Sequence, residues 1–444
     1  MNSRLTVNTT CPTCGAPLDF SEGSNAVQCG YCNSNLLVTG HRQILSYVIS
    51  PLLDGEQAGS RVMQVHHEQE LPCRVIKSHL FFVPYYHLTG HSLRWQKGAQ
   101  AAPSLVSKLS ETDDVLDPLK RQQITFNDRY VDRNFIACDV QNACPYSLGV
   151  RPSVMRLELF RKADLLPRGN VVPLTMPYKD AVRQGLKAVG KQSILYRQVV
   201  GLNLSVIYFP YWMVEIEQDD SSSLTNVDAV AGSVVRRAID TSLLDALRQK
   251  SDIRHTTIGF RPLNCPNCGW DLPMRSQDVI FFCDACDRAW EIHRQTLREV
   301  PYHFADLNEP SGQSPVTHLP FWVLSQPPSA PDARRYFMPA FRYRRLKLLA
   351  DVAQRLTDKQ PSYGVRQGEK PEAYGCFYDQ HDALKFAAFT HVGMRARRSR
   401  RVEITPGEKL PLRNVTLTWI PFREQGGYLV DPFTDYHLPR AGLL

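Results

Sequence analysis

Short apolar segments that contain a proline followed by aromatic residues recur along this chain of 444 residues. β-Branched and aromatic residues dominate these segments, which is typical of strands. Proline lacks the N–H group that a strand donates to its neighbour, so we expect these strands at sheet edges or at bulges. The segments are 80–88, 207–214, 318–324, 336–343 and 419–422.

The aromatic residues that follow each proline allow two interpretations. They could form exposed contacts for a peptide or a nucleic-acid base, or they could pack in the core beside an irregularity of the strand. Large aromatic side chains in an apolar segment are more often buried than exposed. Core packing is therefore the prediction.

Between these strands the apolar positions recur with a helical period. In 179–197, for example, Val182, Leu186 and Val189 fall at i, i+4 and i+7. Comparable stripes predict helices in 227–250, 343–357 and 380–390. An apolar run predicts a strand over 43–50, whereas the polar segment 51–72 reads as a loop.

Two groups of four cysteines share one spacing. In each group a Cys-x-x-Cys pair is followed, after fourteen residues, by a second such pair. An offset of 254 residues superimposes the two groups, and it also superimposes Gly15 on Gly269. The first group is Cys11, Cys14, Cys29 and Cys32, and the second is Cys265, Cys268, Cys283 and Cys286.

This spacing is the pattern of a zinc ribbon. Four thiolates held on two tight turns can surround a tetrahedral Zn²⁺, and a glycine after the first pair lets backbone N–H groups point at the sulfurs. Four protein ligands leave no position for water or substrate, so both predicted zinc sites are structural. Disulfide bonds, buried free thiols and redox chemistry at a Cys-x-x-Cys pair are the alternatives.

The order of ribbon, proline-containing strands, helix and final strand occurs twice. The sequence therefore predicts an α+β fold with internal duplication, in which each ribbon precedes a mostly antiparallel sheet with helices. The expected domains are 1–40 for the first ribbon, 41–255 for the first α+β unit, 256–295 for the second ribbon and 296–444 for the second α+β unit.

The two cysteine units resemble the bacterial rubredoxin-like and transcription-factor-B-like zinc ribbons. The wider pattern resembles bacterial tandem zinc-ribbon proteins of unknown function that combine ribbons with proline-aromatic strands. The stretch 139–157, with Ser-Leu-Gly-Val-Arg-Pro at 147–152, resembles part of that pattern. The resemblance implies bound zinc and the fold, and it implies no activity.

Two clusters of basic residues lack acids. Planar guanidinium groups beside aromatic rings suit phosphate contact and base stacking, and they also suit an acidic protein or an anionic membrane surface. A solvated charged loop is the alternative for the second cluster. We expect the two clusters to lie close together. They are Arg334, Arg335, Arg342, Arg344, Arg345 and Lys347, and Arg395, Arg397, Arg398, Arg400 and Arg401.

Other polar groups give weaker signals. His66, His67 and Glu68 fall in the predicted loop and lack a helical His-Glu-x-x-His frame, so we expect them to be solvated. His87 and His91 stand four apart, but Pro84 and Gly90 favour strand and turn over a metal-binding helix. A further acidic group, also expected in solvent, is Asp113, Asp114 and Asp117. Because no phosphate loop, nucleophile elbow or dinucleotide motif occurs, no catalytic residue is predicted.

Three classes of function follow. The first is a non-enzymatic zinc-binding adaptor or scaffold that joins other proteins in an assembly. The second is a nucleic-acid-binding protein that uses the arginine clusters, although a net charge of +8 is modest for that role. The third is an enzyme whose active site leaves no motif.

The remaining features bear on the compartment. Four further cysteines, without metal spacing, suit a reducing environment, and the N-terminus lacks the apolar core of a signal peptide. The longest apolar run, 206–214, is half a membrane span and contains Pro210. We expect a cytoplasmic protein without a transmembrane segment.

Overall fold

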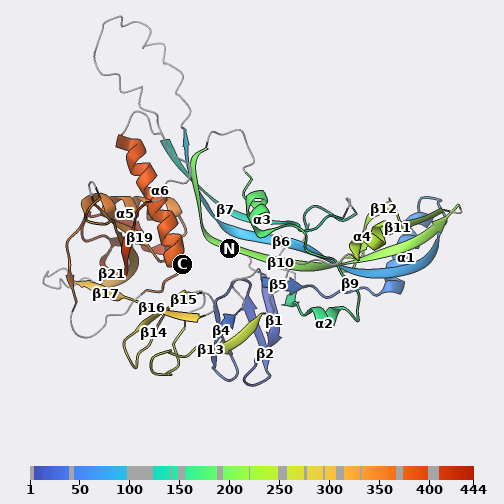
Figure 1. The fold of residues 1–444 in the computed structure, drawn as a ribbon, viewed down its shortest axis with the longest axis horizontal. Coiled ribbons are helices and arrows are strands. Elements are labelled where there is room, and N and C mark those ends of the chain that lie inside the picture. The colour runs from blue at the N-terminus through green and yellow to red at the C-terminus, as the bar shows by residue number, and fades with distance from the viewer. Residues whose placement is uncertain are drawn as a thin grey trace, which may run out of the picture.

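The structure is a computed structural model, and its fold is α+β, as predicted. Helices pack against several sheets, most of whose strands are antiparallel (Figure 1). The residues that the structure describes are 5–39, 45–97, 124–140, 143–148, 156–187, 194–219, 221–248, 258–274, 278–293, 296–306, 315–330, 333–366, 374–398 and 410–444.

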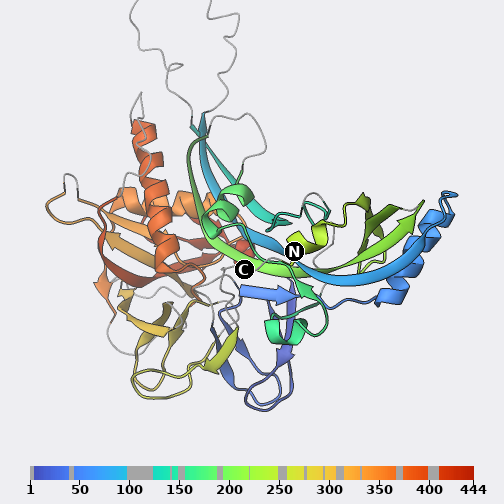
Figure 2. The ribbon, with the colours of Figure 1, turned by 45° about the vertical axis from the view of Figure 1, so that its right-hand side comes forward.

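The larger sheet has ten strands among these residues and forms a long curved surface (Figures 1 and 2). Its centre is an antiparallel pair, β6 (Arg74–Lys97) and β10 (Ile194–Gln218), with β7 (Ile124–Ile136) beside β6. The other strands are β1 (Thr6–Thr10), β2 (Pro17–Ser21), β5 (Leu45–Val48), β8 (Arg156–Leu159), β9 (Asn170–Val171), β11 (Ser221–Asp228) and β12 (Val234–Ile239).

A seven-stranded sheet forms the C-terminal half among the described residues. Its centre is the antiparallel pair β18 (Val316–Ser325) and β21 (Arg413–Gln425). The other strands are β17 (Tyr302–Asp306), β19 (Arg335–Pro339), β20 (Gly364–Val365), β22 (Tyr428–Val430) and β23 (His437–Pro439), and the short 3-10 helix η4 (Arg440–Gly442) follows.

The two sheets share one topology. In the first, β10 pairs in parallel with β5 and antiparallel with β6 and β11, while β7 joins β6 and β12 joins β11. In the second, β21 has the same relations to β17, β18 and β22, while β19 joins β18 and β23 joins β22. This agreement fits a duplicated arrangement.

Individual hydrogen bonds repeat as well. The Ala137 N–H donates to the Pro84 carbonyl, and the Ala340 N–H donates to the Pro320 carbonyl. Each alanine carbonyl then accepts two successive N–H groups just before a helix, from Thr175 and Met176 in the first half and from Phe377 and Tyr378 in the second. The likeness of the halves therefore extends beyond the cysteines.

Four of the five prolines lie within central strands, so the expectation of edges or bulges is wrong for these four; the fifth, Pro339, lies on the edge strand β19. Pro210 follows the part of β10 that pairs with β5 and precedes the part that pairs with β11. Pro84 falls between the β9 and β7 pairings of β6, and Pro421 between the β17 and β22 pairings of β21. Where one neighbour ends and the next begins, no ladder donor is required, so proline is tolerated.

The aromatic residues after the prolines are buried, which confirms core packing. Tyr85, Tyr86, Phe321, Trp322 and Phe422 are each at most 1 % exposed. Two of them also fix the start of a helix, because the Tyr86 hydroxyl donates to the Met176 carbonyl and the Trp322 indole N–H donates to the Tyr378 carbonyl.

The helices match the sequence only in part. α3 (Tyr178–Gly185), α5 (Leu346–Lys359) and α6 (Gln380–Arg398) begin near the predicted positions, and α2 (Lys162–Leu165) is an additional short helix. The predicted helix 227–250 is wrong, since this segment contains the end of β11, then β12 and the short α4 (Leu243–Leu247).

The predicted loop 51–72 contains α1 (Gly55–His67), which is a second correction. A capping box opens the helix, with the Asp54 carboxylate accepting from the Gln57 N–H and the Gln57 side chain accepting from the Asp54 N–H. His66 lies on the buried face of this helix with Ala58 and Val62, so its expected exposure is also wrong.

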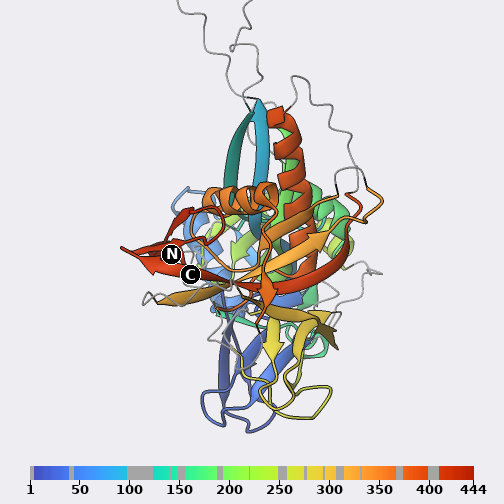
Figure 3. The same cartoon turned by 90° about the vertical axis from the view of Figure 1, so that its left-hand side faces the viewer.

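The strands β6, β7 and β10 of the first half are together called the hairpin. Helix α6 of the C-terminal half packs against this hairpin (Figures 1 and 3). The Trp95 and Phe389 rings stack with centroids 5.0 Å apart, and the Trp95 indole N–H donates to the Phe389 carbonyl. Near its N-terminal end, the Asp382 carboxylate accepts the Gly201 N–H from β10. The two halves therefore share a packed interface.

Candidate metal centres and a central pocket

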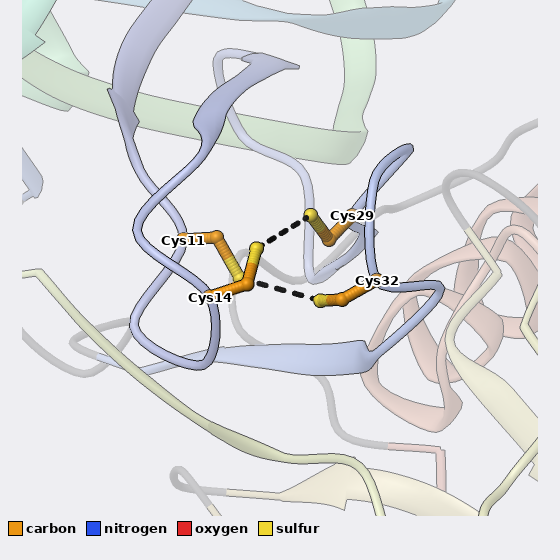
Figure 4. A group of neighbouring side chains, drawn as sticks. All are labelled: Cys11, Cys14, Cys29 and Cys32. Carbon is orange, nitrogen blue, oxygen red and sulfur yellow. Dashed lines mark hydrogen bonds between the residues drawn. The ribbon is translucent and has the colours of Figure 1, made fainter.

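The first cysteine group gathers four sulfur atoms on two turns (Figure 4). Cys11 follows β1 and Cys14 lies on the turn after it, while Cys29 and Cys32 flank the turn between β3 (Ala26–Gln28) and β4 (Asn35–Thr39). The Cys11 and Cys32 Sγ atoms are 3.8 Å apart, as are those of Cys14 and Cys29.

The second group has the same arrangement. The Cys265 and Cys286 Sγ atoms are 3.5 Å apart, and those of Cys268 and Cys283 are 3.4 Å apart. Its strands are β13 (Gly259–Pro262), β14 (Ile280–Phe282), β15 (Ala289–His293) and β16 (Thr296–Val300).

The knuckle glycines are required in both groups. Gly15 and Gly269 have φ of +75° and +76°, a left-handed conformation that glycine adopts without steric cost. Each donates its N–H to the carbonyl of the first cysteine in its group. This explains why the sequence repeats a glycine at these positions.

The geometry fits a tetrahedral metal ion. In each group the four sulfurs all lie within 4.8 Å of one another. Sulfurs about 2.3 Å from a central Zn²⁺ are roughly 3.8 Å apart, which is close to the observed separations. Both cysteine groups are thus positioned to hold a metal ion, and four thiolates are a donor set that Zn²⁺ favours.

At Cys32 and Cys265, hydrogen bonds to the sulfur favour the thiolate form. The Ser34 hydroxyl and N–H both bond to the Cys32 sulfur and lower the pKa of Cys32 to about 6. At Cys265 desolvation opposes ionisation, but the N–H groups of Cys268 and Asn267 lower its pKa to about 6. The turns therefore supply the N–H groups expected around metal-bound sulfur.

The two cysteine units pack directly against each other. β13 of the second unit adds to β4 of the first, pairing Gly259 with Thr39 through Pro262 with Leu36. The Asn35 side chain donates to the Leu272 carbonyl across the same contact. A small shared core contains Ala26, Leu37, Leu263, Cys265, Leu272, Phe281, Cys283 and Trp290.

No protein-family model, curated protein or solved structure matches this chain. Among the described residues, no helix combines the length and apolar composition needed to cross a bilayer.

The residues of the first arginine cluster make different kinds of contact. Arg334 lies 3.8 Å from the Asp358 carboxylate, while Arg335 lies over the Phe337 and Tyr363 rings and donates to the Pro361 carbonyl. Arg342 and Arg344 instead line a central pocket. Arg345 precedes α5, and Lys347 lies in its first turn.

The second cluster is described only at its start. Arg395 is exposed on α6, and Arg397 and Arg398 end that helix. The side chains of these last two lie outside the described residues, as do Arg400 and Arg401 and the acidic group Asp113, Asp114 and Asp117. Partner binding by either cluster, and their proximity, stay predictions.

The central pocket has a volume of about 840 Å³ and was not foreseen from the sequence. Its lining comes from the first ribbon, the β6–β7–β10 hairpin, the second ribbon and the C-terminal half. His87 and His91 lie on the face of β6 that lines it. The predicted strand is correct here, but Gly90 lies inside the strand and not in a turn.

A buried histidine between two carboxylates forms one wall. The His87 Nδ1 is 2.8 Å from Glu22 Oε2, and its Nε2 is 3.0 Å from Asp132 Oδ1. Burial would lower the pKa of His87, but the two carboxylates raise it to about 10. His87 is therefore an imidazolium that neutralises part of this wall.

Proposed function

We propose that both cysteine groups hold structural Zn²⁺ as zinc ribbons, and that the protein is a non-enzymatic scaffold that joins other proteins. The closed set of four thiolates supports a structural role for the ions, because no coordination position is left for a substrate. The cysteine spacing and the sulfur separations support zinc as the metal.

The observation that carries this proposal is that each ribbon contacts one half of the protein and that the two ribbons also contact each other. The first ribbon reaches the hairpin through Glu22, whose carboxylate bonds to His87 and to the Ser205 hydroxyl. The second reaches α6, where Glu291 accepts the Gln380 N–H and Arg298 donates to the Gln380 side chain. Because β13 joins the ribbons, metal in either site would stiffen the connection between the two halves.

An extended, braced sheet suits a scaffold. The β6–β10 pair runs beyond the ribbons and carries α1 at one end and α6 at the other (Figure 1). The exposed side chains Met63, Leu71 and Ile76 lie on and after α1 and give that end apolar contact area. We propose that this end contacts a partner protein.

Affinity purification of the tagged full-length chain at native abundance tests the scaffold role. We expect a protein partner that remains bound after nuclease treatment and in about 0.5 M NaCl. Salt at this concentration screens contacts with phosphate groups. Met63→Asp with Ile76→Asp should release it, and Tyr146→Asp, another exposed site, should not. Release by nuclease alone would contradict the scaffold and favour nucleic acid.

Nucleic-acid binding is the second candidate, favoured by an arginine row that the sequence analysis did not single out. Arg94 pairs with Asn127 and Arg197 in the sheet, so these side chains share a face that also carries Arg129 and Arg133. Burial and the charges of the other three arginines lower the pKa of Arg94. A phosphate backbone would relieve this repulsion.

Salt dependence distinguishes this candidate. If the row contacts phosphates, binding of single-stranded DNA should weaken steeply with salt, by roughly 0.7 power of concentration per contact. Arg129→Gln should reduce that slope, whereas Arg61→Gln on α1 should not. Equal slopes for both variants would exclude a phosphate contact at Arg129.

A further inference from the structure

The central pocket lies between the two cysteine units, the large sheet and the C-terminal half. Gly23 on the first ribbon, Gly201 on β10, Val279 on the second ribbon and Phe377 before α6 all contribute to its lining. A volume of about 840 Å³ is within the range of sites that bind small molecules. Such junctions are frequent places for ligand sites.

Two arginines come from the C-terminal wall. The Arg342 guanidinium lies over the Phe377 ring, 5.2 Å from its centre, in a cation–π contact. Arg344 is exposed, and its N–H bonds to the Gly442 carbonyl, so the backbone that carries it is held. Two arginines that line the same pocket suit a ligand with a carboxylate or phosphate group.

The opposite wall is polar and neutral near these arginines. The His91 ring contacts Tyr130 edge to face, with centroids 5.0 Å apart. Burial and the charge of Arg342 lower the pKa of His91 to about 4, so its imidazole is uncharged at neutral pH. A neutral imidazole offers one donor and one acceptor without adding a second cation.

The carboxylates that line the pocket differ in how many hydrogen bonds they already accept from the protein. Glu22 and Asp132 are bonded to His87, and Asp382 is bonded to the Gly201 N–H and to Lys385. Asp379 accepts the Asp382 N–H with Oδ1, and the residue also lines the pocket, where its carboxylate can accept from a ligand. An acceptor in the same pocket as two arginines favours a ligand that is an anion and also has hydroxyl or amino groups.

We propose that this pocket binds a small organic anion that carries hydrogen-bond donors, with Arg342 and Arg344 holding the anionic group and Asp379 accepting from a hydroxyl or amino group. This site is additional to the scaffold role, since the ligand would contact both halves and both ribbons at once. Occupancy would therefore stabilise their mutual arrangement.

Calorimetric titration of the zinc-loaded full chain tests the site. The probes are inorganic phosphate, which has only the anionic group, and ribose 5-phosphate, which adds hydroxyl donors. Ionic strength is held constant with NaCl. We expect both to bind, with ribose 5-phosphate about tenfold tighter, because Asp379 recognises only the hydroxyl-bearing probe.

Matched variants assign the contacts. Arg344→Gln should weaken both probes at least about tenfold, whereas the control Arg61→Gln should change neither. Asp379→Asn, which keeps an acceptor for the Asp382 N–H, should weaken ribose 5-phosphate and leave phosphate unchanged. Unchanged zinc content and thermal midpoint show that each variant is folded.

Three results would overturn the proposal. No heat with either probe at millimolar concentration removes the anion site. Equal loss in Arg344→Gln and Arg61→Gln shows only non-specific attraction to positive charge. Equal affinity for both probes removes the role of Asp379. None of these results bears on the zinc content or on the protein partner, so the scaffold is judged separately.

Discussion

Glu22 and His87 are joined by a buried hydrogen bond of 2.8 Å that connects the first ribbon to the centre of the long hairpin. The residues are 65 positions apart, and the second ring nitrogen of His87 bonds to Asp132 on the neighbouring strand. The contact therefore joins the first cysteine unit to the sheet through an ion pair that is largely shielded from solvent.

This contact predicts a loss of stability at alkaline pH. The pKa of His87 rises from about 6.5 in an unfolded chain to about 10 in the folded one, so its contribution is complete below about 6.5. It declines as the pH rises and disappears above the folded pKa. Urea unfolding at pH 6, 8 and 10 should show this fall in the free energy of unfolding.

The variant His87→Gln provides the control. It should lose roughly 3 kcal/mol at pH 6, because Glu22 is left buried without a cation, and its stability should change less between pH 6 and 10. Parallel pH profiles of the variant and the parent would show that another group is responsible.

Zinc content should follow the cysteine groups. We expect two Zn²⁺ per chain by elemental analysis, and one per chain in Cys283→Ser with a lower thermal midpoint, because metal binding supplies much of the folding energy of a ribbon. The control is Cys376→Ser, a buried cysteine outside both groups, which should retain two. Fewer than one zinc per chain in the reduced parent would refute both sites.

Two helical glycines should respond oppositely to alanine. A Cβ at Gly393 on α6 would lie 2.3 Å from Trp95 Cζ2, so Gly393→Ala should destabilise the contact between the halves by about 1–3 kcal/mol. A Cβ at Gly59 on α1 would meet its nearest atom at 3.4 Å, an ordinary contact. Gly59→Ala should therefore stabilise the protein by up to about 1 kcal/mol.

Denaturant midpoints of the two glycine variants check this prediction. Because alanine favours a helix equally at both positions, the difference between the variants isolates the packing against Trp95. If Gly393→Ala were as stable as Gly59→Ala, α6 would not pack as closely on the hairpin as described.

The second arginine cluster can be tested as a unit. Replacing Arg395, Arg397, Arg398, Arg400 and Arg401 with serine should weaken binding to the co-purified partner and reduce its salt dependence, if the cluster meets an anionic surface. Pull-down over a salt series measures both effects. Unchanged binding of the partner and of single-stranded DNA would identify the cluster as a solvated surface.

Local features were predictable from the sequence, and long-range ones were not. The cysteine spacing places four sulfurs on two neighbouring turns, so the candidate metal centres needed no knowledge of the sheets. Helix α1 was not predicted because its segment is mostly polar, and its capping box and narrow buried stripe give only a weak helical pattern. Asp54 with Gln57, followed by Ala58 and Val62, was the signal available.

The pocket and the arginine row, Arg94, Arg129, Arg133 and Arg197, both depend on the register of the paired strands. Arg94 and Arg197 are about a hundred residues apart in the sequence, and only the pairing of β6 with β10 makes them neighbours. Likewise, nothing local relates Glu22 to His87 or Arg342 to His91. Sequence patterns predict which face of a strand is apolar, but not which distant strand lies beside it.

The prolines of the central strands also constrain the assembly of the sheets. Two strands of 24 and 25 residues offer many nearly equivalent alignments to their neighbours. If β5 or β11 slid along β10 past Pro210, a carbonyl of the incoming strand would meet a ring without an N–H and stay unbonded, at a cost of about 1–3 kcal/mol. Each proline thus acts as a stop that penalises misaligned pairing while the chain folds.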